Sequence, residues 1–115
     1  MNRRTQRHMP SAQLSEKALA EIIRRVVAIA SPEKVILFGS AARGEMGPDS
    51  DIDLLVVKRG VHRARVAGEI YMGLLGIGQA VDVVVVHLED IERYRESPAL
   101  IIGSALREGK VVYAA

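Results

Sequence analysis

The sequence contains no cysteine and no tryptophan, and three tyrosines and one phenylalanine are its only aromatic residues. The absence of cysteine excludes a disulfide scaffold and any metal site built on thiolates, and it is typical of a reducing compartment. No apolar run approaches the roughly 18 residues that a membrane span requires. Because 49% of the residues are hydrophobic all the same, we expect a soluble cytoplasmic protein with an aliphatic core of Val, Ile, Leu and Ala.

The excess of charge is small and partly concentrated at the start of the chain. The formal net charge is +2, and residues 1–10 carry Arg3, Arg4 and Arg7 without the apolar stretch of a secretory signal. A basic arm can contact nucleic acid, but a solvated leader is the simpler interpretation, since termini are commonly unstructured. We therefore expect a flexible arm over residues 1–14 and one domain over residues 15–115, with no nucleic-acid or membrane partner.

The spacing of apolar residues predicts alternating helices and strands. Ser15 is a suitable N-cap for a first helix that ends at Ser31-Pro32. A turn is expected at Gly47-Pro48-Asp49, and Gly109 is expected as the C′ glycine of the last helix. The predicted strands cover residues 34–38, 51–57, 80–88 and 111–113, and the other predicted helices cover residues 40–44, 61–75 and 98–108. This alternation predicts a single α/β sandwich.

Two aspartates bracket Ile52 at the start of the second predicted strand. Side chains two residues apart on a strand point to the same face, with their Cα atoms about 6.5–7 Å apart, so Asp51 and Asp53 can share divalent ions. Asp51, next to Ser50, can equally be a solvated loop residue. Asp53 lies inside an apolar run, where a lone carboxylate is costly to bury. Bound Mg²⁺ would relieve both that cost and the repulsion between the two charges.

A third aspartate, Asp82, interrupts the apolar run of the third predicted strand. Both faces of that strand are expected to be buried, so the carboxylate needs a cation or a full set of hydrogen bonds. An Arg or Lys partner is the structural alternative. If strands two and three are neighbours, Asp82 can face Asp51 and Asp53. Three such carboxylates suit two-metal phosphoryl chemistry, with the ions roughly 3.5–4 Å apart.

A Gly-Ser pair ends the first predicted strand. Gly39 lets the backbone approach a phosphate closely because it has no side chain, and Ser40 adds a hydroxyl where a helix start favours an anion. A tight-turn glycine and a helix-capping serine are the structural alternatives, and both kinds of role can coexist. Arg43 either contacts the phosphates or braces Asp49 or Asp51.

Other catalytic arrangements find no support in the sequence. His8, His62 and His87 show no metal-ligand spacing. There is no Walker-type Gly-Lys-Ser/Thr motif, and no Ser-His-Asp set suggests a catalytic triad. The acids and the Gly-Ser turn are therefore the candidate site.

Together, Gly39-Ser40, Asp51-Ile52-Asp53 and Asp82 resemble the signature of the minimal nucleotidyltransferase (MNT) family of the DNA polymerase β superfamily. That signature is a Gly-Ser pair, a short loop, Asp-x-Asp on a strand and a third acid on a later strand. Flanking residues are also similar to small members of the family, namely Phe38, Ala42-Arg43-Gly44 and Ser50. The resemblance covers roughly residues 22–113.

The resemblance implies a small mixed β-sheet with packed helices, the palm-like fold of this superfamily. It also implies transfer of a nucleoside monophosphate, AMP from ATP, with two Mg²⁺ ions and release of pyrophosphate. Asp82 would help to activate the attacking hydroxyl. The implied metal ligands and catalytic residues are Asp51, Asp53 and Asp82, and the implied nucleotide contacts are Gly39, Ser40, Arg43 and Ser50.

Small members of this family are often paired with a HEPN-domain RNase, which they silence by adding AMP to a tyrosine. The favoured hypothesis is therefore an antitoxin enzyme that adenylylates a HEPN toxin, because the sequence offers no additional domain for a small acceptor. Two alternatives stay open. One is a binding module that neutralises its partner by contact, and the other is a nucleotidyltransferase for a small molecule within a larger assembly. Each is compatible with a homo-oligomer.

Overall fold

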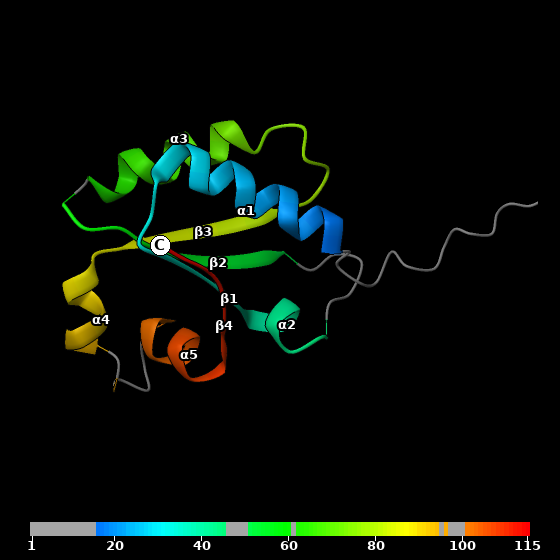
Figure 1. Cartoon of the computed structure of the whole chain (residues 1–115). Coiled ribbons are helices and arrows are strands. Elements are labelled where there is room, and N and C mark those ends of the chain that lie inside the picture. Colours follow the sequence, from blue (N-terminus) through cyan, green and yellow to red (C-terminus); the bar gives the residue numbers. More distant parts are fainter. Residues whose placement is uncertain (1–15, 46–50, 61, 95, 97–100) are drawn as a thin grey trace, which may run out of the picture.

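A four-stranded mixed β-sheet forms the centre of the molecule, with helices on both of its faces (Figure 1). The computed structural model describes residues 16–45, 51–60, 62–94, 96 and 101–115. The strands are β1 (Lys34–Phe38), β2 (Ile52–Val57), β3 (Val81–Val86) and β4 (Lys110–Ala114). The helices are α1 (Glu16–Ala30), α2 (Gly39–Ala42), α3 (Arg63–Gly73), α4 (Leu88–Tyr94) and α5 (Ile101–Glu108). In the part of the chain that the structure describes, no helix has the length and apolarity to cross a membrane.

The strand order is β3-β2-β1-β4, so β3 and β4 are the two edges of the sheet. β1 pairs antiparallel with β2 and with β4, whereas β2 and β3 are parallel. Parallel neighbours need a crossover connection, and α3 lies between β2 and β3 in the chain. The mixed sheet implied by the family resemblance is therefore confirmed.

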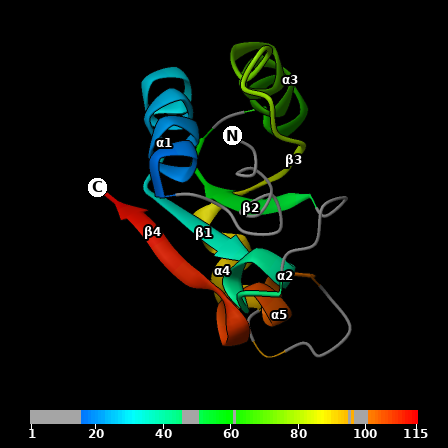
Figure 2. The ribbon, with the colours of Figure 1, turned by 90° about the vertical axis from the view of Figure 1, so that its right-hand side faces the viewer.

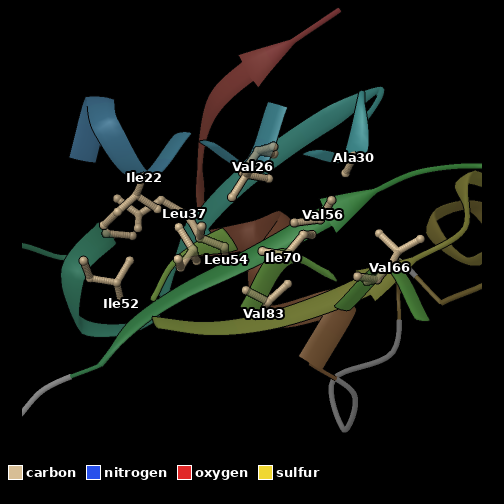
Figure 3. Close-up of a cluster of buried hydrophobic side chains, with 14 residues drawn as sticks. Ile22, Val26, Ala30, Leu37, Ile52, Leu54, Val56, Val66, Ile70 and Val83 are labelled. Atoms are coloured by element: carbon tan, nitrogen blue, oxygen red, sulfur yellow. The ribbon is translucent and has the colours of Figure 1, made fainter. Parts of the chain in front are cut away.

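One face of the sheet is covered by α1 and α3, and Figure 3 shows the aliphatic cluster between them. The apolar residues of α1 recur at helical spacing, while alternate residues of each strand point to this face. Full burial of a side chain such as Leu54 or Ile70 stabilises the fold by about 1.5–3 kcal/mol. The labelled members of the cluster are Ile22, Val26, Ala30, Leu37, Ile52, Leu54, Val56, Val66, Ile70 and Val83.

The opposite face is covered by α4 and α5, which lie on the other side of the sheet in Figure 1. The intervening residues of the same strands supply this second core, because side chains alternate across a sheet. Two buried faces explain why β1 and β2 are almost continuously apolar instead of alternating. The buried members are Ile36, Phe38, Leu55, Val57, Val86, Ile91 and Ala105.

The predicted strands and the predicted helices are confirmed, with differences at their ends. β1 has the predicted bounds, β2 begins one residue later at Ile52, and β3 is shorter than residues 80–88. The first helix ends as predicted before Pro32, where Ser31 takes a positive φ of 44°. Ser15, the turn at residues 47–49 and residues 98–100 lie outside the described residues.

The helix α4 was not predicted. It has seven residues and only Ile91 is buried, so it carries little of the periodicity on which helix prediction depends. Its start is fixed locally, because the Asp90 carboxylate accepts a hydrogen bond of 3.0 Å from the backbone N–H of His87. That contact is the reverse half of a capping box.

Gly109 ends α5 as predicted, but the predicted reason is wrong. A C′ glycine takes a positive φ, and Gly109 is not among the described glycines that do so. A Cβ at this position would overlap the carbonyl oxygen of Ala105 and lie 2.6 Å from Ile36 Cγ2 and 2.9 Å from the carbonyl oxygen of Leu37. The glycine is therefore needed so that the end of α5 can pack against β1.

We expect Gly109→Ala to lower the free energy of unfolding by about 1–3 kcal/mol, the usual cost of overpacking. The atoms that the new Cβ would meet include two backbone oxygens, which cannot rotate away. Gly68→Ala is the matched control, because no atom lies within 4 Å of a Cβ added there, and alanine is favoured over glycine in a helix by about 1 kcal/mol. Urea unfolding measures both variants. Equal stability of the two would contradict the close approach at Gly109.

Candidate functional site

The predicted site residues meet at the end of the sheet where β1 finishes and β2 and β3 begin. Because β1 and β2 are antiparallel, Phe38 at the end of β1 pairs with Asp53 near the start of β2. Because β2 and β3 are parallel and in register, Asp53 lies directly opposite Asp82. Neighbouring strands are about 4.7–4.9 Å apart. The prediction that strands two and three are neighbours is confirmed, and two of the three acids stand side by side.

The three acids form one electrostatically coupled group. Burial raises the pKa of Asp53, the charges of Asp82 and Asp51 raise it further, and the Arg43 charge lowers it. Loss of water and nearby like charges both disfavour an ionised carboxyl. Asp53 is half-buried, whereas Asp51 and Asp82 are exposed. Solvent therefore reaches Asp51 and Asp82, whereas the charge of Asp53 is disfavoured by burial and by its two acidic neighbours.

The expectation that Asp82 is buried is wrong. β3 is an edge strand, and only its later residues are covered well, so that Val83, Val85 and Val86 are buried while Asp82 is exposed. Because β3 is apolar almost throughout, its sequence does not reveal at which residue the strand becomes covered by other elements. A carboxylate in water needs neither an Arg or Lys partner nor a metal ion, so burial no longer argues for either role of Asp82, and its position beside Asp53 is what remains.

Gly39 is required by the carboxylate of Asp53. Its φ is +72°, a conformation that side chains rarely adopt, and a Cβ here would overlap Asp53 Oδ2 and lie 3.2 Å from Asp53 Cγ. A residue without a side chain thus lets the end of β1 close over the central acid. The sequence predicted that the missing side chain of Gly39 leaves space for a phosphate. In the structure, the same space is also needed by the Asp53 carboxylate.

Ser40 lies in the first turn of α2 and is not its cap. The N-cap is Phe38, which forms no side-chain capping hydrogen bond, so the capping alternative for Ser40 does not hold. The Ser40 carbonyl oxygen accepts a hydrogen bond of 2.8 Å from the backbone N–H of Glu45. Ser50, the other serine predicted at the nucleotide, lies outside the described residues.

Arg43 is held by two glutamates. Its guanidinium donates to Glu45 Oε1 at 2.9 Å and to Glu108 Oε1 at 3.4 Å, and these partners raise its pKa. Among the described residues it braces neither Asp51 nor another aspartate through an ion pair, and Asp49 lies outside them. Neither glutamate was predicted as a partner of Arg43. Glu45 is two residues away in the sequence, but nothing in the sequence places the end of α5, and hence Glu108, beside α2.

The donor set suits a hard cation. All three acids offer carboxylate oxygens, which Mg²⁺ prefers, and the raised pKa of Asp53 reflects negative charge that a cation would stabilise. Within the described residues, no three His, Cys, Asp or Glu side chains are grouped so that they could hold a metal ion. Mg²⁺ commonly takes one or two carboxylates and completes its coordination with water and substrate phosphates. The residues therefore fit an ion that arrives with a nucleotide.

We expect Asp53→Asn to raise the melting temperature of the metal-free protein at neutral pH. A carboxyl whose pKa is raised on folding binds its proton more tightly in the folded state, so stability falls as pH rises from the ordinary aspartate pKa of about 3.9 through the raised value. The amide carries no such penalty. The gain should therefore be present above the raised pKa of Asp53 and vanish below about pH 3.9.

Thermal unfolding in EDTA across this pH range measures the effect. Glu96→Gln, which removes an exposed carboxylate elsewhere, is the control and should show no such pH-dependent gain. A gain of Asp53→Asn that is the same at all pH values would contradict the electrostatic origin.

Comparison with known proteins connects this geometry to a family. The sequence model of the nucleotidyltransferase domain family matches residues 19–112, which include all three acids and the Gly-Ser turn. Among proteins of curated function, none matches the chain.

Several solved structures share the fold. A Sulfolobus solfataricus protein assigned as a nucleotidyltransferase aligns with a TM-score of 0.58 and 24% identity over 85% of this chain and 78% of its own. A toxin-antitoxin structure with AMP-PNP aligns with a TM-score of 0.61 and 20% identity over 89% and 75%. A Shewanella oneidensis structure of a tri-AMPylated HEPN toxin in complex with an MNT antitoxin aligns with a TM-score of 0.51 and 17% identity over 87% and 70%.

At these identities the structural likeness establishes the fold, and the family match establishes the relationship. Both agree with the resemblance that the Gly-Ser and Asp-x-Asp residues indicated. The chain therefore belongs to the nucleotidyltransferase domain family.

Proposed function

We propose that the chain is an enzyme that transfers a nucleoside monophosphate, AMP from ATP, to a hydroxyl group of a partner protein. The observation that carries the proposal is the in-register pair of Asp53 and Asp82, with Asp53 held against Gly39 at the end of β1. Family membership supports the reaction type. A structural neighbour crystallised with AMP-PNP supports an adenine nucleotide.

The turn from β1 into α2 is the proposed triphosphate site. The first N–H groups of a helix lack carbonyl partners within it, so those of Gly39, Ser40 and Ala41 can donate to phosphate oxygens. The Ser40 hydroxyl is a further donor in the same turn. Arg43 is paired with Glu45 and Glu108 and still lowers the pKa of Asp53. We therefore assign it the role of supplying positive potential at the site.

Asp51 and Asp53 are the proposed ligands of a Mg²⁺ ion that accompanies the triphosphate, and Asp82 completes the set for a second ion. When bound, Mg²⁺ would neutralise the phosphate charge and lower the pKa of an acceptor hydroxyl. Asp53 is suited to this role because its half-buried carboxylate is already under electrostatic strain. A cation bound at this position would relieve the repulsion between the carboxylates, and this relief would favour its binding.

In the proposed reaction the acceptor oxygen attacks the α-phosphorus of ATP. A new O–P bond forms while the bond between the α-phosphorus and the bridging oxygen of pyrophosphate breaks, and pyrophosphate leaves with the electron pair. The acceptor hydroxyl gives up its proton. We assign to Asp82 the role of orienting that hydroxyl and accepting the proton, and its exposure and its position beside Asp53 support this role.

We propose that the acceptor is a tyrosine of a HEPN-domain toxin. The exposure of Asp51 and Asp82 supports an acceptor that comes from outside the domain, since a protruding side chain of another protein can reach them. A structural neighbour consists of an AMPylated HEPN toxin with its MNT antitoxin. A phenol has a pKa near 10 and is a poor nucleophile at neutral pH. This acceptor therefore requires activation, which Asp82 and a cation bound by the three aspartates would supply.

The first test is ATP binding. We expect titration calorimetry to give an affinity at least about tenfold higher with Mg²⁺ than in EDTA, a difference of about 1.4 kcal/mol, because the ion joins the triphosphate to Asp51 and Asp53. Asp53→Asn should lose this enhancement, and Glu96→Gln should keep it. Equal affinity in EDTA would exclude metal-linked nucleotide binding.

The second test is the chemistry on the partner. After co-expression with a HEPN-domain toxin, intact-mass spectrometry should find one or a few added AMP groups on the toxin, and Tyr→Phe changes in the toxin should remove them. The Asp51→Asn/Asp53→Asn double variant should add none, whereas Glu96→Gln should behave as wild type. A toxin silenced without any mass change, and equally by the double variant, would identify the chain as a module that acts by contact.

A further inference from the structure

We propose that three apolar residues at the end of α3, namely Tyr71, Met72 and Leu75, form a docking surface for the segment of the partner protein that carries the acceptor hydroxyl. This inference deepens the proposed function and rests on it for the direction from which the acceptor arrives. It is carried by the exposure of these side chains, by their position beside Asp82, and by the contacts through which α1 fixes the end of α3. We call the three residues the α3 surface.

Large apolar side chains are concentrated at this end of α3 although solvent reaches them. Met72 is 68% exposed, Leu75 is 67% exposed and Tyr71 is 41% exposed. Only two other large apolar side chains of the described residues are exposed, Leu88 on α4 and Val111 on β4. Single exposed apolar residues are ordinary in a folded protein, whereas a group of them marks a surface that binds another molecule.

Packing within the domain does not account for the α3 surface. The side of α3 that faces the sheet consists of Val66, Ile70 and Leu74, which are buried and recur at helical spacing. Met72 and Leu75 lie outside that stripe, where a helix usually carries polar side chains. Their apolar area therefore contributes little to folding and is available to a partner.

The path of the chain places the α3 surface beside Asp82. α3 follows β2 and precedes β3, and because these two strands are parallel, α3 returns to the end of the sheet where both strands begin. The Tyr71 hydroxyl accepts a hydrogen bond of 2.8 Å from the backbone N–H of Val83, the residue after Asp82. The segment between α3 and β3 borders the start of β2 as well, since the Ala80 carbonyl oxygen accepts a hydrogen bond of 2.9 Å from the backbone N–H of Ile52.

The proposed triphosphate site lies on the other side of the acids. Along the sheet the order is β3, β2, β1, so Asp53 lies between Asp82 and the turn at Gly39. Figure 2 shows α2, which begins at that turn, and α3 on opposite faces of the sheet. In phosphoryl transfer the attacking and leaving oxygens are roughly in line. If pyrophosphate leaves at the turn from β1 into α2, the acceptor arrives from the side of Asp82, where the α3 surface lies.

The end of α3 is fixed by α1 before any partner binds. The Arg25 guanidinium donates to the carbonyl oxygens of Gly73 at 3.3 Å and of Leu75 at 3.4 Å. It also donates to Glu21 Oε2 at 2.8 Å, which holds the guanidinium in place. Gly73 permits close packing of the two helices, because a Cβ there would overlap the Ile29 side chain of α1. A surface that is ordered in advance loses less entropy when a partner binds.

The chemistry of this surface selects an apolar occupant. Residues 70–81 contain no Asp, Glu, Lys, Arg or His, so charge attraction contributes nothing to recognition here. Apolar side chains that flank the acceptor hydroxyl would cover the α3 surface and exclude water from it, and such buried contacts carry much of the affinity of protein interfaces. The α3 surface thus supplies binding, and the adjacent acids supply the chemistry.

The first test measures docking with the chemistry removed. In the Asp51→Asn/Asp53→Asn double variant, titration calorimetry gives the affinity for the HEPN-domain toxin. Addition of Met72→Gln/Leu75→Gln should weaken this affinity at least about tenfold, because large apolar side chains at the centre of an interface commonly carry this much binding energy or more. Unchanged affinity, or a double variant that does not bind the toxin at all, overturns the proposal.

Leu88→Gln/Val111→Gln is the matched control. It also replaces two exposed apolar residues, but on α4 and β4 and therefore away from the acids, and it should bind the toxin as before. All four replaced residues are exposed, so circular dichroism should show that both sets of changes leave the fold intact.

The second test uses the chain with its acids unchanged. Met72→Gln/Leu75→Gln should raise the KM for the toxin at least about tenfold, while calorimetry should find the same affinity for ATP with Mg²⁺ as in the wild type. A loss of ATP affinity would show that this surface holds the nucleotide, which overturns the proposal. A wild type that transfers no AMP, combined with toxin binding that these changes weaken, would refute the proposed enzyme and support the docking surface. The two proposals therefore fail separately.

Discussion

The parallel pairing of β2 with β3 is the interaction on which the site depends. It sets Asp53 opposite Asp82. The two carboxylates repel each other, so their own interaction cannot be what brings them together. The register is enforced farther along the strands, where Leu54, Val56 and Val83 pack under α1 and α3. A slip of one residue would turn each of these side chains to the other face of the sheet. The aliphatic core therefore holds together two carboxylates that would otherwise separate.

The same arrangement explains why the acids lie at the beginning of their strands. Farther along β2 both faces are covered, and Leu55, Val56 and Val57 are buried. A carboxylate there would lose its water entirely, at a cost of several kcal/mol unless it were paired. At the second residue of the strand, Asp53 keeps part of its solvent and is backed by the Gly39 turn. At this end of the sheet a carboxylate can therefore be fixed by a strand and still reach a ligand.

Much of the fold could be predicted from the sequence, because α1 has a strong periodic pattern of apolar residues and β1 and β2 are almost continuously apolar. The site residues were found for the same reason, since Asp53 and Asp82 interrupt such signals. The features that could not be predicted depend on which parts of each strand are covered by other elements, and on contacts between residues far apart in the sequence. The exposure of Asp82 follows from β3 being at an edge, and the pairing of Arg43 with Glu108 follows from where α5 packs. Gly109 was placed correctly but explained by its backbone angle, whereas its neighbours are what require it.

The contact of Tyr71 with β3 has a consequence for how this edge of the sheet can meet another chain. One phenolic oxygen engages both backbone groups of Val83, so a strand that paired with β3 at this residue would have to displace the Tyr71 hydroxyl. A strand edge whose backbone groups are already bonded within the molecule is a poorer template for a strand of another chain. The oxygen atom by which tyrosine differs from phenylalanine thus removes one site of strand addition from the β3 edge.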